Sequence, residues 1–256
     1  SACLVGSEMC IRDRDYGMHK DTLQDLQLFY SSTEKKLTTL KEYVGRMKEG
    51  QEAIYYGCGR TVEAIDALPQ ADQIKEAGYE MLYMTGQVDE FSIKTLREYD
   101  GKKFLNIRTD EIDLSTDEQK KALAEENEAA ADLFAAMKEA LGEKVHAVRF
   151  TDKLKSHPVC LSTEGGLSME MEQTLNAMPG RENRFKADVV LELNPDHPVT
   201  AKLKEYAVTD KEKLADYAKL LYAEGCLIGG VPIEEPAELC RLITGLMDCL
   251  LYTSPS

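Results

Sequence analysis

Three short apolar segments separated by amphipathic ones constrain the fold of this chain more than any other feature. Ala53-Ile-Tyr-Tyr56, Tyr79-Glu-Met-Leu-Tyr-Met84 and Lys103-Phe-Leu-Asn-Ile107 have the length and residue types of buried strands. Helical periodicity follows the first two of them, at 62–68 and 89–99. Strands joined by helices at this spacing predict βαβ units, in which neighbouring strands run parallel. Residues 15–113 are therefore predicted to form a small α/β domain.

The pattern changes at residue 114. Ser115-Thr-Asp-Glu118 reads as a capping box that begins one long, charged helix ending at Gly142. Beyond it two strands are expected, at 145–150 and 189–193, and helical patterns fill most of the remainder to residue 247. We predict a second, helix-rich α+β domain over 114–247 that ends in a helix pair. The chain is then α/β in its first part and α+β overall.

Both ends depart from the patterns beside them. Residues 1–14 read SACLVGSEMCIRDR, and residues 248–256 read DCLLYTSPS. Each resembles a peptide translated from sequencing-adapter DNA, so we predict that both are artefacts that lie outside the fold.

Charge and composition exclude several classes of partner. The net charge of -15 argues against nucleic-acid binding and against an anionic membrane surface, because both need a basic footprint. No apolar run approaches the roughly 18 residues of a membrane span, and no early segment reads as a signal peptide. The seven cysteines form no CxxC pair, which fits reduced thiols better than a metal site. We expect a cytoplasmic protein with no metal, no nucleic acid and no membrane partner.

Signals for an enzyme are weak. His157 and Cys160 are the residue types of a Cys–His nucleophile, but Ser156-His157-Pro158 reads as a loop and nothing marks an oxyanion hole. Gly57-x-Gly59 before a helix hints at a phosphate-binding turn, yet it lacks the remaining residues of a P-loop. No catalytic, cofactor-binding or metal-binding residue is assigned. A stand-alone α/β enzyme that uses Cys160 and His157 stays open as an alternative.

Two helical segments near the end of the second domain carry apolar stripes. One begins at Lys211 and the other at Pro236, and each has apolar residues at offsets of 3, 4 and 7. Two such helices from each of two chains can form a four-helix bundle. The predicted homodimer interface consists of Leu214, Tyr217, Ala218, Leu221, Leu239, Leu242, Ile243 and Leu246. Packing of both stripes on their own domain is the alternative.

Several longer motifs resemble one family. They are Tyr30-Ser-Ser-Thr-Glu34, Leu40-Lys-Glu-Tyr-Val-Gly-Arg-Met-Lys-Glu-Gly50, Ile54-Tyr-Tyr56, Val88-Asp-Glu90 and Glu192-Leu-Asn-Pro-Asp-His197. Together they resemble the bacterial ninety-kilodalton heat-shock chaperones of the HtpG type, from about residue 15 to 247. The resemblance implies that 15–113 is the distal part of the middle domain and that 114–247 is the C-terminal dimerisation domain.

The resemblance also implies a function. The expected protein is a fragment of an ATP-dependent stress-response chaperone that dimerises and holds non-native client proteins. The family's ATP-binding domain would lie upstream, so this chain is expected to bind no cofactor and to hydrolyse no ATP, although the full-length family uses ATP and Mg. A purely structural dimerisation module is a further alternative.

The resemblance favours a client-binding helix between Gly166 and Pro179. Leu167, Met171, Leu175 and Met178 share one face of the helical pattern there, with Met169 pointing away. Methionines give such a stripe a flexible surface that suits varied partners. We predict that these four residues bind clients, and burial of the stripe in the core is the alternative.

Overall fold

The computed structural model describes residues 24–86, 88–112, 114–177 and 184–252. The chain divides into two compact units, with residues up to 114 and 163–187 in unit 1, and 115–162 and residues from 188 onward in unit 2. The first division lies beside the predicted boundary, whereas the prediction placed 163–187 in the second domain. The predicted artefact at 1–14 lies outside the described residues, and the last helix continues past residue 248 to Tyr252.

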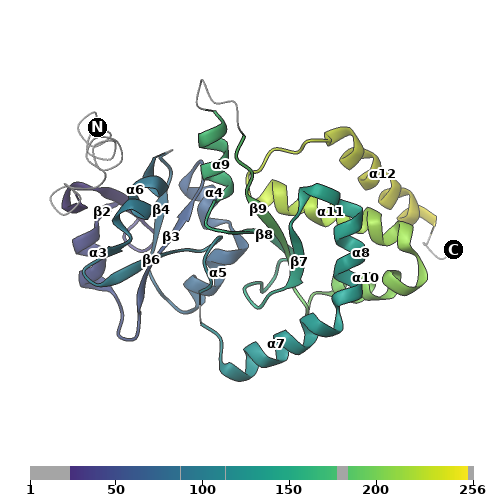
Figure 1. The fold of residues 1–256 in the computed structure, drawn as a ribbon, viewed down its shortest axis with the longest axis horizontal. Helices are drawn as coiled ribbons and strands as arrows, with labels where there is room; N and C mark the ends of the chain where they lie inside the picture. The colour runs from purple at the N-terminus through teal and green to yellow at the C-terminus, as the bar shows by residue number, and fades with distance from the viewer. Residues whose placement is uncertain (1–23, 87, 113, 178–183, 253–256) are drawn as a thin grey trace. The chain divides into compact units, whose positions relative to one another are not determined.

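Unit 1 is built on a six-stranded sheet with the order β2-β1-β4-β3-β6-β5, of which Figure 1 labels β2, β3, β4 and β6. Its strands are β1 (Leu28–Ser31), β2 (Leu37–Thr39), β3 (Ala53–Cys58), β4 (Met81–Met84), β5 (Glu98–Tyr99) and β6 (Lys102–Asn106). β3 pairs in parallel with both β4 and β6, which confirms the predicted βαβ arrangement. β1, β2 and β5 add antiparallel edges.

Helices cover both faces of this sheet. They are α3 (Leu40–Arg46), α4 (Val62–Asp66), α5 (Pro69–Glu76) and α6 (Asp89–Leu96), and a short helix, η1 (Gln24–Leu26), precedes the first strand. Every residue of β3 is buried, as expected for a central strand covered on two sides. Alternate side chains serve the two faces: Ile54 clusters with residues of α3 and α6, and Tyr55 with residues of α4 and α5.

Tyr43 of α3 joins three parts of unit 1 through its buried hydroxyl. The hydroxyl donates to the Glu80 carbonyl at 2.7 Å, and it accepts from Gln51 Nε2 at 3.0 Å and from the Tyr55 amide at 3.2 Å. Tyr43→Phe leaves these groups without their partner inside the core. Since an orphaned buried polar group costs about 1–3 kcal/mol, we expect urea unfolding to show a loss of about 2 kcal/mol. Tyr30→Phe is the control, because that hydroxyl makes only an exposed bond to the Lys35 carbonyl; equal losses in both variants would contradict the prediction.

Unit 2 combines a three-stranded sheet with helices. The strand order is β7-β9-β8, and β7 and β9 are parallel. The strands are β7 (Ala147–Phe150), β8 (Val159–Glu164) and β9 (Asp188–Leu193). The helices are α7 (Asp117–Ala129), α8 (Ala131–Leu141), the short η2 (Gly142–Lys144), α10 (Pro198–Thr209), α11 (Lys211–Ile228) and α12 (Pro236–Tyr252). Because α8 contacts β7, α10 and α11, it forms the centre of the unit. The α+β fold class is confirmed.

The long helix predicted from Ser115 to Gly142 is wrong in two respects. It begins one residue later than predicted, because Thr116 forms the capping box with Gln119 while the Ser115 hydroxyl donates to Asp152. It also breaks at Ala130 into two helices. α8 buries Leu133 and other apolar residues, whereas α7 buries none. Only the second of the two helices therefore contributes buried side chains to the core of unit 2.

Two other local predictions need correction. The helical spacing of Leu26 and Phe29 in the sequence predicts one helix, but these residues lie in η1 and β1, because pairing of β1 with β2 and β4 outweighs local spacing. Thr209-Asp-Lys-Glu212 has the sequence pattern of a capping box, which predicts that Thr209 caps the helix that follows it. Asp210 is the cap, and its carboxylate accepts from the Lys213 amide at 3.1 Å.

Candidate functional site

The helix predicted to bind clients is shorter than expected. α9 spans Met169–Asn176, and its N-cap is Ser168, whose hydroxyl accepts from the Met171 amide at 3.0 Å. Leu167 therefore lies before the helix rather than on it. Met178 lies outside the described residues.

Burial on α9 is confined to its beginning. Ser168 and Met169 are buried, whereas every residue from 170 to 177 is partly or fully exposed. Met169 was expected to point away from the stripe, and it is the side chain that α9 buries. Leu167, Met171 and Leu175 are half-buried, so their side chains are not fully enclosed in a core. The client-binding role of these residues stays a prediction.

A buried carboxylate lies beside the N-terminus of α9. Glu90, on α6, is 4% exposed and accepts from the Ser168 hydroxyl and, at 3.0 Å, from Asn106 Nδ2. The Lys94 ammonium lies 3.7 Å from Glu90 and donates to the Gly166 carbonyl. Burial raises the pKa of Glu90 above its ordinary value, although the bond from Ser168 and the charge of Lys94 oppose this shift.

A buried guanidinium forms the second half of this polar cluster. Arg108 follows β6, is 2% exposed and makes an ion pair with Glu170 in the first turn of α9. One Arg108 nitrogen also lies 3.7 Å from Met169 Sδ. The Arg108 carbonyl accepts from the Thr163 amide at 3.3 Å. These contacts explain why 163–187 groups with unit 1.

The sequence did not reveal this cluster. Asn106 lies within a predicted apolar strand, and no sequence pattern marks Arg108. Arg108 and Glu170 lie 62 residues apart in the chain, and Glu90 and Ser168 lie 78 residues apart, so residue spacing carries no signal for either contact. The one available hint was a polar Asn106 inside a segment otherwise typical of a core strand.

The residues predicted for the dimer interface fall into two groups. Leu214, Ala218 and Leu221 of α11 are buried within the chain, where α11 contacts α8 and α10. Tyr217 is half-buried, and its ring centroid lies 5.3 Å from that of Tyr206, with the two rings tilted by 52°. On α12, Leu239 is half-buried, Leu242 is buried, and Ile243 and Leu246 are exposed. The exposed part of the predicted surface therefore lies on α12.

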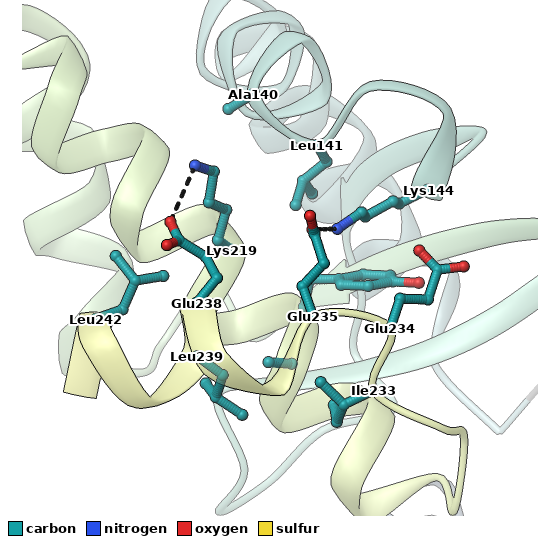
Figure 2. A pocket seen from close by; sticks show the side chains of 12 residues that line it. Ala140, Leu141, Lys144, Lys219, Ile233, Glu234, Glu235, Glu238, Leu239 and Leu242 are labelled. Atoms are coloured by element: carbon teal, nitrogen blue, oxygen red, sulfur yellow. Dashed lines mark hydrogen bonds and ion pairs between the residues drawn. The ribbon is translucent and has the colours of Figure 1, made fainter.

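A pocket opens between α8, α11 and α12, and Figure 2 shows its lining. Its apolar lining includes Leu141, Ile233, Leu239 and Leu242. Two ion pairs link the α12 side to the other helices, Lys144 with Glu235 and Lys219 with Glu238 (Figure 2). Arg241 is the main cause that lowers the pKa of Glu238 to about 2. Because these pairs are solvent-exposed, they stabilise little, and the leucines hold α12 in place.

The structure gives other roles to the residues of the weak enzyme signals. Cys160 is buried on β8, and its thiol lies 3.5 Å from the Glu192 carboxylate, an environment that offers a substrate no access. At Gly57 and Gly59, an added Cβ would meet Ile65 at 2.7 and 2.8 Å. These glycines allow α4 to pack closely on β3. Close packing therefore accounts for both glycines, and a phosphate-binding turn is not needed to explain them.

In the part of the chain that the structure describes, no cluster of His, Cys, Asp and Glu has the arrangement of a metal site. Within the same residues, no helix has the length and apolar character required to cross a membrane.

Comparison with known proteins gives matches over most of the chain. The family model of the Hsp90 protein matches residues 9–255. This range includes part of each end, 1–14 and 248–256, that we predicted to be an artefact. Chaperone protein HtpG of Bacillus velezensis is 49% identical over 234 residues, which is 91% of this chain and 37% of that protein. HtpG of Clostridium acetobutylicum is also 49% identical over 234 residues, with the same coverage. HtpG of Bacillus subtilis is 47% identical over 233 residues, again 91% of this chain and 37% of the relative.

Proposed function

We propose, because this chain belongs to the Hsp90 protein family, that it is the dimerising and client-holding part of an HtpG-type chaperone. The observation that carries the proposal is 49% identity to chaperone protein HtpG over 91% of the chain. The chain spans about 37% of the length of the relatives it matches. Holding of non-native clients, pairing of two copies and a cytoplasmic location are therefore proposals about this part.

The half-buried side chains of α9 support a client-binding role. Met171 and Leu175 are apolar and only partly covered, and they lie on a helix with few buried residues. A partly exposed methionine can adapt to different apolar segments, as a chaperone's surface requires. A surface of this kind suits an unfolded chain better than a rigid pocket does.

Client binding is testable with Met171→Ala. We expect the variant to lose about 1 kcal/mol of stability, as for a partly exposed position. It should bind a fluorescently labelled, reduced and carboxymethylated protein about fivefold more weakly, measured by anisotropy. Gln173→Ala is the matched control, because Gln173 is exposed on the same helix, and it should bind like the wild type.

Two outcomes would count against the client proposal. If the wild type neither binds the unfolded probe nor suppresses its aggregation, the chain is a structural dimerisation module. If Met171→Ala loses several kcal/mol of stability and keeps its affinity, α9 is a core element and the client site lies elsewhere. The measurements are made without ATP, because we propose that this part needs no nucleotide; saturable ATP turnover would contradict that.

A further inference from the structure

We propose that Glu90 and Arg108 are positioning residues for α9, fixing its first turn on unit 1 and thereby holding its client-binding face in place. The inference rests on the proposed client-binding function of α9. Neither residue is expected to touch a client, because both side chains are buried.

The attachment of this segment to unit 1 is concentrated in a few polar contacts. Glu90 accepts from Ser168, and Arg108 pairs with Glu170. Just before the helix, Lys94 donates to the Gly166 carbonyl, and the Thr163 amide donates to the Arg108 carbonyl. All of these contacts fall between residues 163 and 170. The helix is therefore held at one end.

Beyond its first turn, the hydrogen bonds that α9 side chains make among the described residues stay within the segment 163–187. Glu172 accepts from the Ala187 amide at 2.8 Å, and the Asn176 side chain exchanges two hydrogen bonds with the backbone of Phe185. These bonds tie the two arms of the segment to each other. The direction in which Met171 and Leu175 face is thus set mainly by the first turn.

The chemistry of these contacts suits a positioning role. Charge-assisted hydrogen bonds are directional, so they fix an orientation, whereas apolar contact alone tolerates rotation and sliding. Ser168 links the two functions, since the same hydroxyl accepts from the Met171 amide and donates to Glu90. Helix start and helix placement are thereby coupled through one atom.

Two substitutions, at the N-cap and in the first turn of α9, test the contacts without changing a residue of the two apolar clusters of unit 1. Ser168→Asp keeps a good N-cap but places a carboxylate against Glu90. Glu170→Ala removes the partner of Arg108 and favours the helix. We expect hydrogen–deuterium exchange of the α9 amides to rise about tenfold in each, with the amides of β3 and β4 unchanged. Affinity for the labelled unfolded protein should fall about three- to tenfold, because a loose helix must be ordered on binding.

A rescue and a control make the test specific. Glu90→Gln combined with Ser168→Asp removes the like charge and should restore wild-type exchange on α9. Gln173→Ala should change neither exchange nor affinity. Unchanged α9 exchange in both Ser168→Asp and Glu170→Ala would overturn the inference. Faster exchange of α9 with unchanged affinity would overturn the positioning role.

The inference and the proposed function fail in different ways. If Met171→Ala leaves client affinity unchanged, the client site is not on α9, and the proposed function fails at that helix. The attachment of α9 to unit 1 is tested separately, by hydrogen–deuterium exchange of the α9 amides measured without any client. A wild type that binds clients through Met171, together with Ser168→Asp and Glu170→Ala variants that behave like the wild type, overturns the inference alone.

Discussion

Replacing Glu192 with glutamine is expected to lower the free energy of unfolding of unit 2 by about 3 kcal/mol at neutral pH. Glu192 lies on the central strand β9 and is 1% exposed. Its carboxylate accepts two bonds from Arg149, at 3.0 and 2.6 Å, and lies 3.7 Å from the Lys153 ammonium. Removing the charge leaves the nearly buried Lys153 without its counterion. Because Arg149 is one-third exposed and water can solvate it, we expect the lower end of the usual cost.

The effect of Glu192→Gln should depend on pH. Burial raises the pKa of Glu192, but the charges of Lys153 and then Arg149, with the hydrogen bonds to the carboxylate, together lower it by more than burial raises it. The pKa of Glu192 therefore lies below its ordinary value of 4.5. A lowered pKa means that the carboxylate stabilises the fold fully above the unfolded pKa, and that this contribution is lost as pH falls through the folded pKa. The stability difference between wild type and variant should therefore be constant near neutrality and narrow below about pH 4.5.

Urea unfolding followed by circular dichroism measures the difference, and hydrogen exchange of the β7 and β9 amides assigns it to unit 2. The control is Glu205→Gln, because Glu205 forms an exposed pair with Lys202. Such a pair contributes about 0.5 kcal/mol or less. A Glu192→Gln variant as stable as the Glu205→Gln control would contradict the prediction, and so would a difference that stays constant down to pH 3.

The parts of the fold that were predictable are those that local patterns encode. β3 and β4 are short runs of buried residues flanked by helical periodicity, and this identified the parallel sheet. Thr39-Leu-Lys-Glu42 has the sequence pattern of a capping box, and the structure contains that box, with the Glu42 amide and carboxylate both hydrogen-bonded. In each case the residues that determine the element lie within a few positions of one another.

The parts that were missed depend on distant partners. β8 contains Ser162 and Thr163, which are polar and yet buried, so the strand lacked the alternation that marks a half-buried strand. The cluster around Glu90 and Arg108 joins α6 and the end of β6 to a helix much later in the chain. A buried charge is stabilised by its neighbours in space, and a sequence pattern shows only neighbours along the chain.

Pairing of two chains should depend on the exposed face of α12, and Ile243→Glu is expected to weaken it at least 100-fold. Leu242, Leu246, Leu239, Ile243 and Met247 follow one another around a single arc of the helix, at about 100° per residue. Leu242, at one edge of the arc, is 5% exposed because the chain itself covers it. Met247, at the other edge, is 58% exposed. The apolar stripe is thus wider than the contacts that this chain makes with it.

The increase in exposure from Leu242 to Met247 determines which substitutions can test the interface. A charge at Leu242 would disturb the packing of α12 on its own unit, so a monomer from that variant would be ambiguous. Ile243, at 38% exposed, can be changed while Leu242 continues to hold the helix. If a second copy covers the open edge, Ile243→Glu buries an uncompensated charge, which costs about 3–5 kcal/mol and corresponds to the loss of 100-fold or more in affinity.

Sedimentation equilibrium over micromolar concentrations measures the association. Thr244→Glu is the matched control, because Thr244 is exposed on the neighbouring position of the same helix and lies off the stripe. It should remain dimeric, and Leu242→Ala should lose stability while the surviving folded fraction still pairs. A wild type that is monomeric throughout this range would remove the dimer proposal. A dimeric Ile243→Glu variant would move the interface away from α12. Of the predicted interface residues on α11, all within the described part of the chain, Tyr217 is the one left partly exposed.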